Sequence, residues 1–198
     1  MSGKIKFLIL ELDFTGNFKE AEAIAEQAEL AGKGQVEVIV RQCSQEQELW
    51  EAVKETSPDW LQIVATSDRR RLLITVEERI VAWLNKRELL KNLQTLAPNL
   101  RLVGLNAQLD AKDLDSFSSL YALVGMQAGY NPIAMRQFAP RFYGSLAGGL
   151  ALGAAFKAAF AKVQKEVLEH GGAPTMGFNH AIDPESFVFL PASEATVH

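Results

Sequence analysis

The sequence has little of the two residue types that most often carry thiol and imidazole chemistry: it contains one cysteine and three histidines. The single cysteine, Cys43, cannot form an internal disulfide or a cysteine-rich metal site. The histidines stand at positions 170, 180 and 198, and neither their spacing nor a predicted helix or strand supports metal binding. Between Ser44 and Glu169 there is no cysteine or histidine. We therefore expect no metal site, and no Cys–His pair within that stretch.

Motifs that cradle phosphates or position a nucleophile are also absent. No G-x-G-x-x-G or G-x-x-x-x-G-K-[ST] sequence follows a predicted strand. The glycines at 148, 149 and 153 fall in a helical region, where close helix packing explains them better. Ser145 lies in GSLAGG, which lacks the G-x-S-x-G spacing of a nucleophile elbow. We therefore expect no bound cofactor.

Strong charge of either sign and long apolar runs are missing as well. The chain has 20 basic and 24 acidic residues, a net charge of −4, which argues against a nucleic-acid binder. The stretch 142–161 is rich in alanine and glycine and is interrupted by Lys157, so it predicts two close-packed helices rather than a membrane span. We expect neither nucleic acid nor a membrane as a partner. The scarcity of cysteine favours a cytoplasmic location.

What the sequence does contain is a regular alternation of strand and helix patterns. The 198 residues are 48% hydrophobic, enough for one sizeable core. Alternating strands and helices predict an α/β fold, a three-layer αβα sandwich with a mainly parallel sheet of about six strands. We expect one domain over residues 1–191 and a flexible tail over 192–198. The expected strands cover residues 4–10, 35–40, 60–65, 100–105 and 121–126, with a last edge strand in ESFVFLP at 185–191.

Local signals refine this outline. Residues 72–84 fit either a β-hairpin that turns at Glu77–Arg79 or a strand followed by a helix, and their Ile, Val and Thr content favours a small hairpin insertion. Pro140 is expected to kink the helix that contains it. The expected caps are Asn17 and Gly32 for the first helix, a Ser44–Gln47 capping box for the second, an Asn85–Glu88 pattern for the third, and Asn131–Pro132 for the fourth.

Polar residues follow several predicted strands at their carboxyl ends, where α/β proteins usually place their sites. Asp13, Asp68 and Asp110 each come just after a strand, so they could together hold a divalent cation. Acidic residues are also common in such loops without any function. Arg69, Arg70 and Arg71 follow directly and could grip an anion or an acidic partner segment, or simply be solvated.

Three segments in a fixed order resemble one protein family. They read SPDWLQIVATS at 57–67, APNLRLVGLNAQLDA at 97–111, and LYALVGMQAGYNPIAMRQFAPRFYGSLAGGLALGAAFKAA at 120–159. The first is similar to the third-strand segment of bacterial caspase-like domains of the CHAT and effector-associated kind, approximately P-D-I-L-H-F-S-G-H-G. The second resembles their fourth-strand segment, approximately L-V-V-L-N-A-C-Y-S. The resemblance implies a bacterial caspase-like fold.

The resemblance also implies where the catalytic residues of such a peptidase would stand. In this family a Cys thiolate attacks the peptide carbonyl, and a His at the neighbouring strand end assists proton transfer. The His position falls on Thr66, the following glycine on Ser67, and the Cys on Gln108. Glutamine cannot act as the nucleophile, and threonine cannot transfer protons as an imidazole does. The resemblance therefore implies a pseudoprotease without catalytic residues, that is, a pseudoenzyme.

A site that has lost its chemistry can keep a groove for a polypeptide. Peptidases of this family pair the substrate backbone with a sheet edge. The remnant groove would be lined by Thr66, Ser67, Gln108 and Asp110, with the three arginines at 69–71 as further contacts. We therefore predict a regulatory or scaffolding domain whose partner is another protein.

Two other functions stay open at the level of sequence. One is an enzyme that uses Asp13, Asp68 and Asp110 with a bound ion. The other is a small-molecule sensor with its ligand in the crevice near residues 12–14 and Gln108. For the oligomeric state we favour a monomer, because Pro191 at the end of the last strand blunts edge pairing.

Overall fold

A parallel sheet forms the centre of the molecule, and it follows from apolar runs that are long enough to be covered on both faces. The computed structural model describes residues 3–13, 19–68, 70–109, 122–126, 132–169 and 187–190. Five strands pair in parallel in the order β2-β1-β3-β7-β8, and β9 lies antiparallel beside β8. The strands are β1 (Ile5–Glu11), β2 (Val36–Gln42), β3 (Trp60–Val64), β7 (Leu102–Gln108), β8 (Ala122–Met126) and β9 (Phe187–Leu190).

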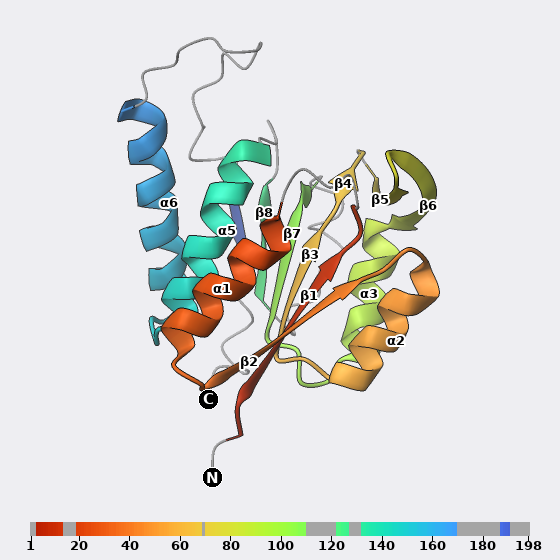
Figure 1. The fold of residues 1–198 in the computed structure, drawn as a ribbon, viewed down its shortest axis with the longest axis horizontal. Coiled ribbons are helices and arrows are strands. Elements are labelled where there is room, and N and C mark those ends of the chain that lie inside the picture. The colour runs from red at the N-terminus through yellow and green to blue at the C-terminus, as the bar shows by residue number, and fades with distance from the viewer. Residues whose placement is uncertain are drawn as a thin grey trace.

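Helices cover both faces of this sheet (Figure 1). Side chains alternate along β3, so that Leu61 and Ile63 join one hydrophobic cluster while Trp60 and Val64 join the other. The predicted α/β class with a mainly parallel sheet is thus confirmed. One face carries α1 (Glu20–Gly32), α5 (Pro132–Ala147) and α6 (Leu152–Glu169), and the other carries α2 (Glu46–Thr56) and α3 (Lys86–Leu96).

A second, three-stranded antiparallel sheet lies beside the carboxyl ends of the parallel strands (Figure 1). It consists of β4 (Thr66–Ser67), β5 (Arg71–Val76) and β6 (Arg79–Asn85). The turn between β5 and β6 places Glu77 and Glu78 at φ 48° and 64°, the left-handed backbone that a tight hairpin turn requires. The hairpin alternative for residues 72–84 is therefore confirmed.

Two of the predicted helix caps are wrong by one or two residues. Gly32 is the last residue of α1, and the positive φ angles fall on Lys33 and Gly34 instead. A Cβ on Gly32 would lie 3.0 Å from a Val36 methyl carbon, so packing explains this glycine. The predicted Ser44–Gln47 capping box does not form, because Gln45 is the N-cap of α2 and Ser44 donates from its backbone N to Glu48 at 2.7 Å.

Other predicted boundaries are confirmed. The Asn85 side chain caps α3 by accepting hydrogen bonds from the backbone N of Arg87 and Glu88. Ser57 ends α2 in a left-handed conformation. The helical stretch after residue 131 divides into α5, which contains Pro140, and α6. Asn17 and Asn131 lie outside the described residues. Within the described ranges, no helix has the length and hydropathy needed to cross a membrane.

Gly104 provides a stability test of this packing. A Cβ at position 104 would collide with the Gln62 side-chain oxygen and the Tyr143 hydroxyl, and both residues are buried. Gly104→Ala should therefore lower the free energy of unfolding by about 1–3 kcal/mol, the usual cost of overpacking a core. Urea denaturation measures this change. Gly3→Ala adds a methyl group in open space and is the matched control. If both variants unfold at the wild-type urea concentration, the described packing of β7 against α5 is wrong.

Candidate functional site

The strand ends that carry the sequence-predicted site belong to two neighbouring strands. β3 pairs directly with β7, and their last paired residues are Val64 and Asn106. Thr66 and Gln108 each stand two residues further along their own strand segment. Gln108 is the last residue of β7, because this strand continues three residues beyond its predicted end at 105. We call the region at the carboxyl ends of β1, β3 and β7, together with the residues that follow these strands, the rim.

The structure describes only some of the predicted rim residues. Thr66 and Ser67 form β4, and Thr66 is exposed while Ser67 is half-buried. The backbone of Gln108 pairs with Met126 of β8. The side chain of Gln108 and the whole of Asp110 and Arg69 lie outside the described residues.

Asp13 and Thr66 are joined across the rim. The Thr66 hydroxyl donates a hydrogen bond to the Asp13 carboxylate. Asp13 also forms an isolated bridge with Thr75 of β5. The end of β1, the end of β3 and the hairpin are therefore tied together at this point.

Asp68 holds the loop that leads from β4 into β5. Its carboxylate accepts hydrogen bonds from the backbone N of Arg70 at 2.9 Å and of Arg71 at 2.8 Å. It also accepts one from Arg71 Nε at 2.7 Å. The side-chain bond from Arg71 is the largest cause that lowers the pKa of Asp68 to about 2. Asp68 is thus ionised at neutral pH and engaged within its own loop.

A buried chain of polar side chains lies below the rim on the α1 and α5 face. Gln62 Nε2 donates to Asn106 Oδ1 at 3.0 Å, and Asn106 Nδ2 donates to Glu20 of α1. Glu20 also lies against Arg136 of α5, with 3.8 Å between Oε2 and Nε. We call these four residues the buried polar chain. It connects β3, β7, α1 and α5 directly beneath the positions of Thr66 and Gln108.

Glu20 titrates unusually because of this position. Its side chain is only 9% exposed. Desolvation by burial is the largest cause that raises its pKa to about 7, with a smaller contribution from the Glu11 carboxylate, while the Arg136 guanidinium acts in the opposite direction. Shifted carboxylates mark functional sites in many proteins. Here the carboxyl group is enclosed and bonded to Asn106, so it links α1 to β7.

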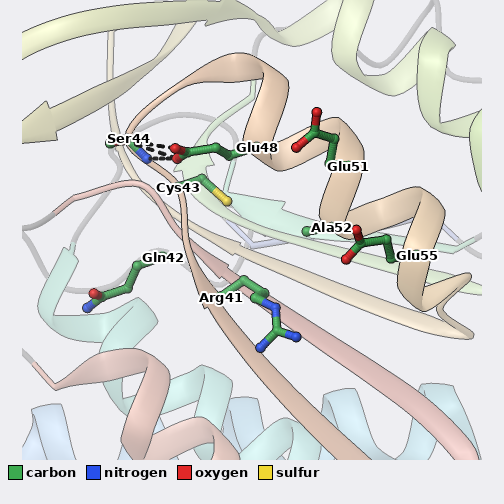
Figure 2. Close-up of a pocket in the computed structure, with 8 residues that line it drawn as sticks. All are labelled: Arg41, Gln42, Cys43, Ser44, Glu48, Glu51, Ala52 and Glu55. Carbon is green, nitrogen blue, oxygen red and sulfur yellow. Dashed lines mark hydrogen bonds between the residues drawn. The ribbon is translucent and has the colours of Figure 1, made fainter.

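Cys43, the single cysteine, lies away from the pair of strand ends at 66 and 108. It follows β2, which is separated from β3 by β1. The thiol is buried, and desolvation is the largest cause that raises its pKa to about 11. A surface hollow of about 470 Å³ lies beside it, between the end of β2 and α2 (Figure 2). Glu48, Glu51 and Glu55 line the α2 side of this hollow. Burial, with a smaller contribution from the Glu48 carboxylate, raises the thiol pKa and so keeps Cys43 protonated at neutral pH.

The acidic rim residues do not form a cation site in the part of the chain that the structure describes. No group of three or more His, Cys, Asp or Glu side chains is placed there to hold a metal ion. Asp13 is bonded to Thr66, and Asp68 to Arg71. The site can therefore offer hydrogen bonds and charge, and its described residues at the ends of β3 and β7 include no cysteine or histidine that could form a Cys–His pair.

No family model matches the chain, and no curated protein matches it significantly.

Sequence reasoning missed the buried polar chain. The signal for Gln62 and Asn106 is a polar residue inside an otherwise apolar strand, WLQIV and LVGLNAQ. No comparable signal exists for Glu20, because its bond to Asn106 spans 86 positions of sequence. Such a contact follows only from the docking of α1 on the sheet.

The buried Glu20 carboxyl gives the protein a measurable pH dependence. Its pKa is raised from 4.5 to about 7 by folding, so the folded chain keeps a proton that the unfolded chain loses. The stabilisation is therefore fully present below about pH 4.5 and is lost as the pH rises through about 7. The loss amounts to at most about 3 kcal/mol. Glu20→Gln should remove it.

Urea unfolding at about five evenly spaced pH values between pH 4 and pH 8 measures this difference in the free energy of unfolding. Glu26→Gln is the matched control, because Glu26 is exposed on the same helix. Its profile should follow that of the wild type. Parallel profiles for the wild type and Glu20→Gln would contradict the protonation of Glu20.

Proposed function

We propose that this protein is a non-catalytic caspase-like domain that acts by binding another protein at its rim. In this proposal β9 is the sixth strand of a caspase-like sheet. The remnant groove is formed by Thr66, Ser67, Gln108 and Asp110, and the arginines at 69–71 add contacts. The protein is a bacterial, cytoplasmic scaffold or regulator, and it is a monomer.

One observation carries the proposal. The family that the sequence resembles needs its two catalytic residues at neighbouring strand ends. The positions that correspond to them are Thr66, two residues after β3, and Gln108, the last residue of β7, and these two strands are paired in parallel. The two positions therefore lie at adjacent strand ends at the same level, which is the arrangement that a Cys–His pair of this family requires. This agreement supports the caspase-like reading of both segments.

The chemistry of the site supports a non-catalytic role. No cysteine or histidine occurs from Ser44 to Glu169, so neither rim position can be replaced by a neighbour in the chain. Cys43 is buried, its pKa is raised to about 11, and β1 lies between its strand and β3. The Thr66 hydroxyl is engaged with Asp13. The rim can offer hydrogen bonds to a partner, and hydrogen bonds hold the added strand in β-augmentation.

A peptidase assay tests the loss of catalysis. We expect the purified protein to release no fluorophore from peptides cleaved after Arg, Lys or Asp, because the two positions of the Cys–His pair hold Gln108 and Thr66. Turnover that co-elutes with the protein on size-exclusion chromatography would contradict a pseudoenzyme, whether or not Gln108→Ala abolishes it.

Capture from the native cell tests the binding function. We expect the wild-type protein to retain a specific protein that Thr66→Arg loses, because a long cation blocks the exposed start of the groove. Leu30→Arg is the matched control, since Leu30 is 72% exposed near the opposite end of α1 from Glu20. Its capture should equal that of the wild type. Equal capture by all three proteins would contradict a rim interface.

A further inference from the structure

We propose that the free edge of the main sheet, strand β2, docks an extended protein segment in which basic and apolar residues alternate. The surface consists of the outer edge of β2 and the hollow that α2 lines beside it (Figure 2), and we call it the β2 edge surface. Strand β1 separates it from β3, which Thr66 of the rim follows. This second docking surface is therefore additional to the rim of the proposed function and does not depend on it.

Strand β2 lies at one edge of the main sheet. In the order β2-β1-β3-β7-β8-β9 it is the first strand, and among the described strands it pairs only with β1. Its seven residues, Val36–Gln42, pair with Ile5–Glu11 in one continuous register. A strand at a sheet edge has backbone groups on its outer side that a further strand can pair with. β2 thus offers an uninterrupted edge of the length that β-augmentation uses.

Two hydrogen bonds show which backbone groups of β2 point outward. The backbone N of Ile5 donates to the Gln35 carbonyl at 3.0 Å, and the backbone N of Cys43 donates to the Glu11 carbonyl at 3.0 Å. The N–H and C=O groups of one strand residue point to the same side, and those of the next residue point to the other side. The odd-numbered residues of β2 therefore face β1. The even-numbered residues direct their backbone groups away from the sheet, and these are Val36, Val38, Val40 and Gln42.

One contact on this outer side must give way to an added strand. The Val40 carbonyl accepts a hydrogen bond from the Arg41 guanidinium at 3.5 Å, and the contact is exposed. A hydrogen bond of this length is weak. A strand that pairs with Val40 can therefore replace it.

The side chains of β2 give the two sides of the edge different character. Val38 packs against the hydrophobic cluster under α1 and α5, and Ile39 packs against the cluster under α2 and α3. By the same alternation Val40, which is 36% exposed, lies on the α1 side, while Glu37 and Arg41 lie on the α2 side. Apolar residues of an added segment would cover Val38 and Val40. The residues between them would stand on the α2 side.

The α2 side of the edge is acidic. The hollow of about 470 Å³ is lined by three carboxylates, Glu48, Glu51 and Glu55, and by one cation, Arg41, so its lining has a net charge of −2. Glu48 and Glu51 accept hydrogen bonds from uncharged donors, and no ion pair among the described residues involves the three carboxylates. Lys or Arg side chains of a bound segment would supply the missing cations.

The charged residues around the hollow do not cancel this charge. Lys6 stands beside Glu37 in the strand pairing, so these two charges offset each other. Lys54 lines a second hollow on α2 together with Glu46. Glu11 adds a further negative charge at the end of β1, where its carboxylate accepts a hydrogen bond from the last residue of β2. The β2 edge surface is therefore negative as a whole.

A second copy of the chain fits this surface less well. Antiparallel pairing of two β2 strands about Ile39 would align Glu37 with Arg41 of the second copy. It would also bring the α2 carboxylates of both copies to the same face of the joined sheet, where like charges oppose association. A basic segment of another protein meets the same edge without this repulsion.

Fluorescence anisotropy of short peptides tests the β2 edge surface. The probe is a fluorescein-labelled peptide of about six residues in which Lys alternates with Val. We expect it to bind the wild type with an affinity that falls as salt is added. Its counterpart with Glu for Lys should not bind, because its side chains would meet the carboxylates of α2.

Methylated peptides separate strand addition from simple charge attraction. In an antiparallel segment, the Val residues opposite Val38 and Val40 direct their backbone N–H groups at β2. N-methylation of Val should therefore weaken binding by at least about tenfold, because it removes these donors. N-methylation of Lys, whose N–H groups point away from β2, should leave binding unchanged. The opposite pattern would indicate a parallel segment at the same edge, and unchanged binding of both peptides would overturn strand addition.

Variants of the protein assign the surface. Val40→Pro removes an outward N–H group and is tolerated at a sheet edge, so it should weaken binding of the Lys peptide by about tenfold or more. Val40→Thr keeps the N–H group and the branched shape and is its matched control. Glu55→Lys should weaken binding by a similar factor through charge repulsion, and it decides the question if Val40→Pro does not fold. Glu26→Lys makes the same change of charge at an exposed position of α1, on the other face of the sheet, and should bind like the wild type.

The outcomes separate the β2 edge surface from the rim. Equal binding of the Lys and Glu peptides, or wild-type binding by both Val40→Pro and Glu55→Lys, would overturn the basic ligand of β2. A dimer in sedimentation experiments that Val40→Pro dissolves would also overturn it, because the occupant would then be a second copy. Thr66→Arg should leave binding of the Lys peptide unchanged, and loss of binding in this variant would place the peptide on the rim instead. Cell capture that depends on Thr66 tests the proposed function separately, so either surface can fail while the other stands.

Discussion

The parallel pairing of β3 with β7 is the constraint on which the rest of the structure depends. It places the ends of two apolar strands side by side, and Gln62 and Asn106 are bonded across it at 3.0 Å. Buried amides are costly unless each is bonded, so this contact fixes the register of the two strands. Glu20 and Arg136 extend the chain to α1 and α5. The level of the rim is thus set by bonds that lie beneath it.

Above this foundation, the described rim residues are engaged in holding the loops together. Thr66 is bonded to Asp13, and Asp68 binds both the backbone and the guanidinium of Arg71. These contacts account for Asp13, Thr66 and Asp68 among the polar residues that follow the strands. They leave the small sheet as the exposed feature beside the rim, with Trp83 under the Arg71 cation. In the proposed function, a surface of this kind recognises a polypeptide.

Much of the fold could be predicted from the sequence because its signals are local. Continuous apolar runs indicated the parallel strands, β-branched residues indicated the hairpin, and Asn85 indicated its helix cap. The caps at Gly32 and Ser44 were misplaced because capping depends on backbone angles that neighbouring packing decides. The buried polar chain and the exposure of Trp83 could not be predicted, since both depend on which distant elements meet. The caspase-like reading stays a prediction that the adjacency of β3 and β7 supports.

Site-specific photocrosslinking tests the central claim, that the strand ends bind a protein partner, most directly. A benzophenone side chain would be placed at Thr66 on the rim, and at the exposed Leu30 and Lys54, in the last turns of α1 and α2, as controls. Irradiation in the native cell should join one protein to the chain from position 66 and not from either control. The same protein joined from position 30 or 54, with none from position 66, would contradict the claim.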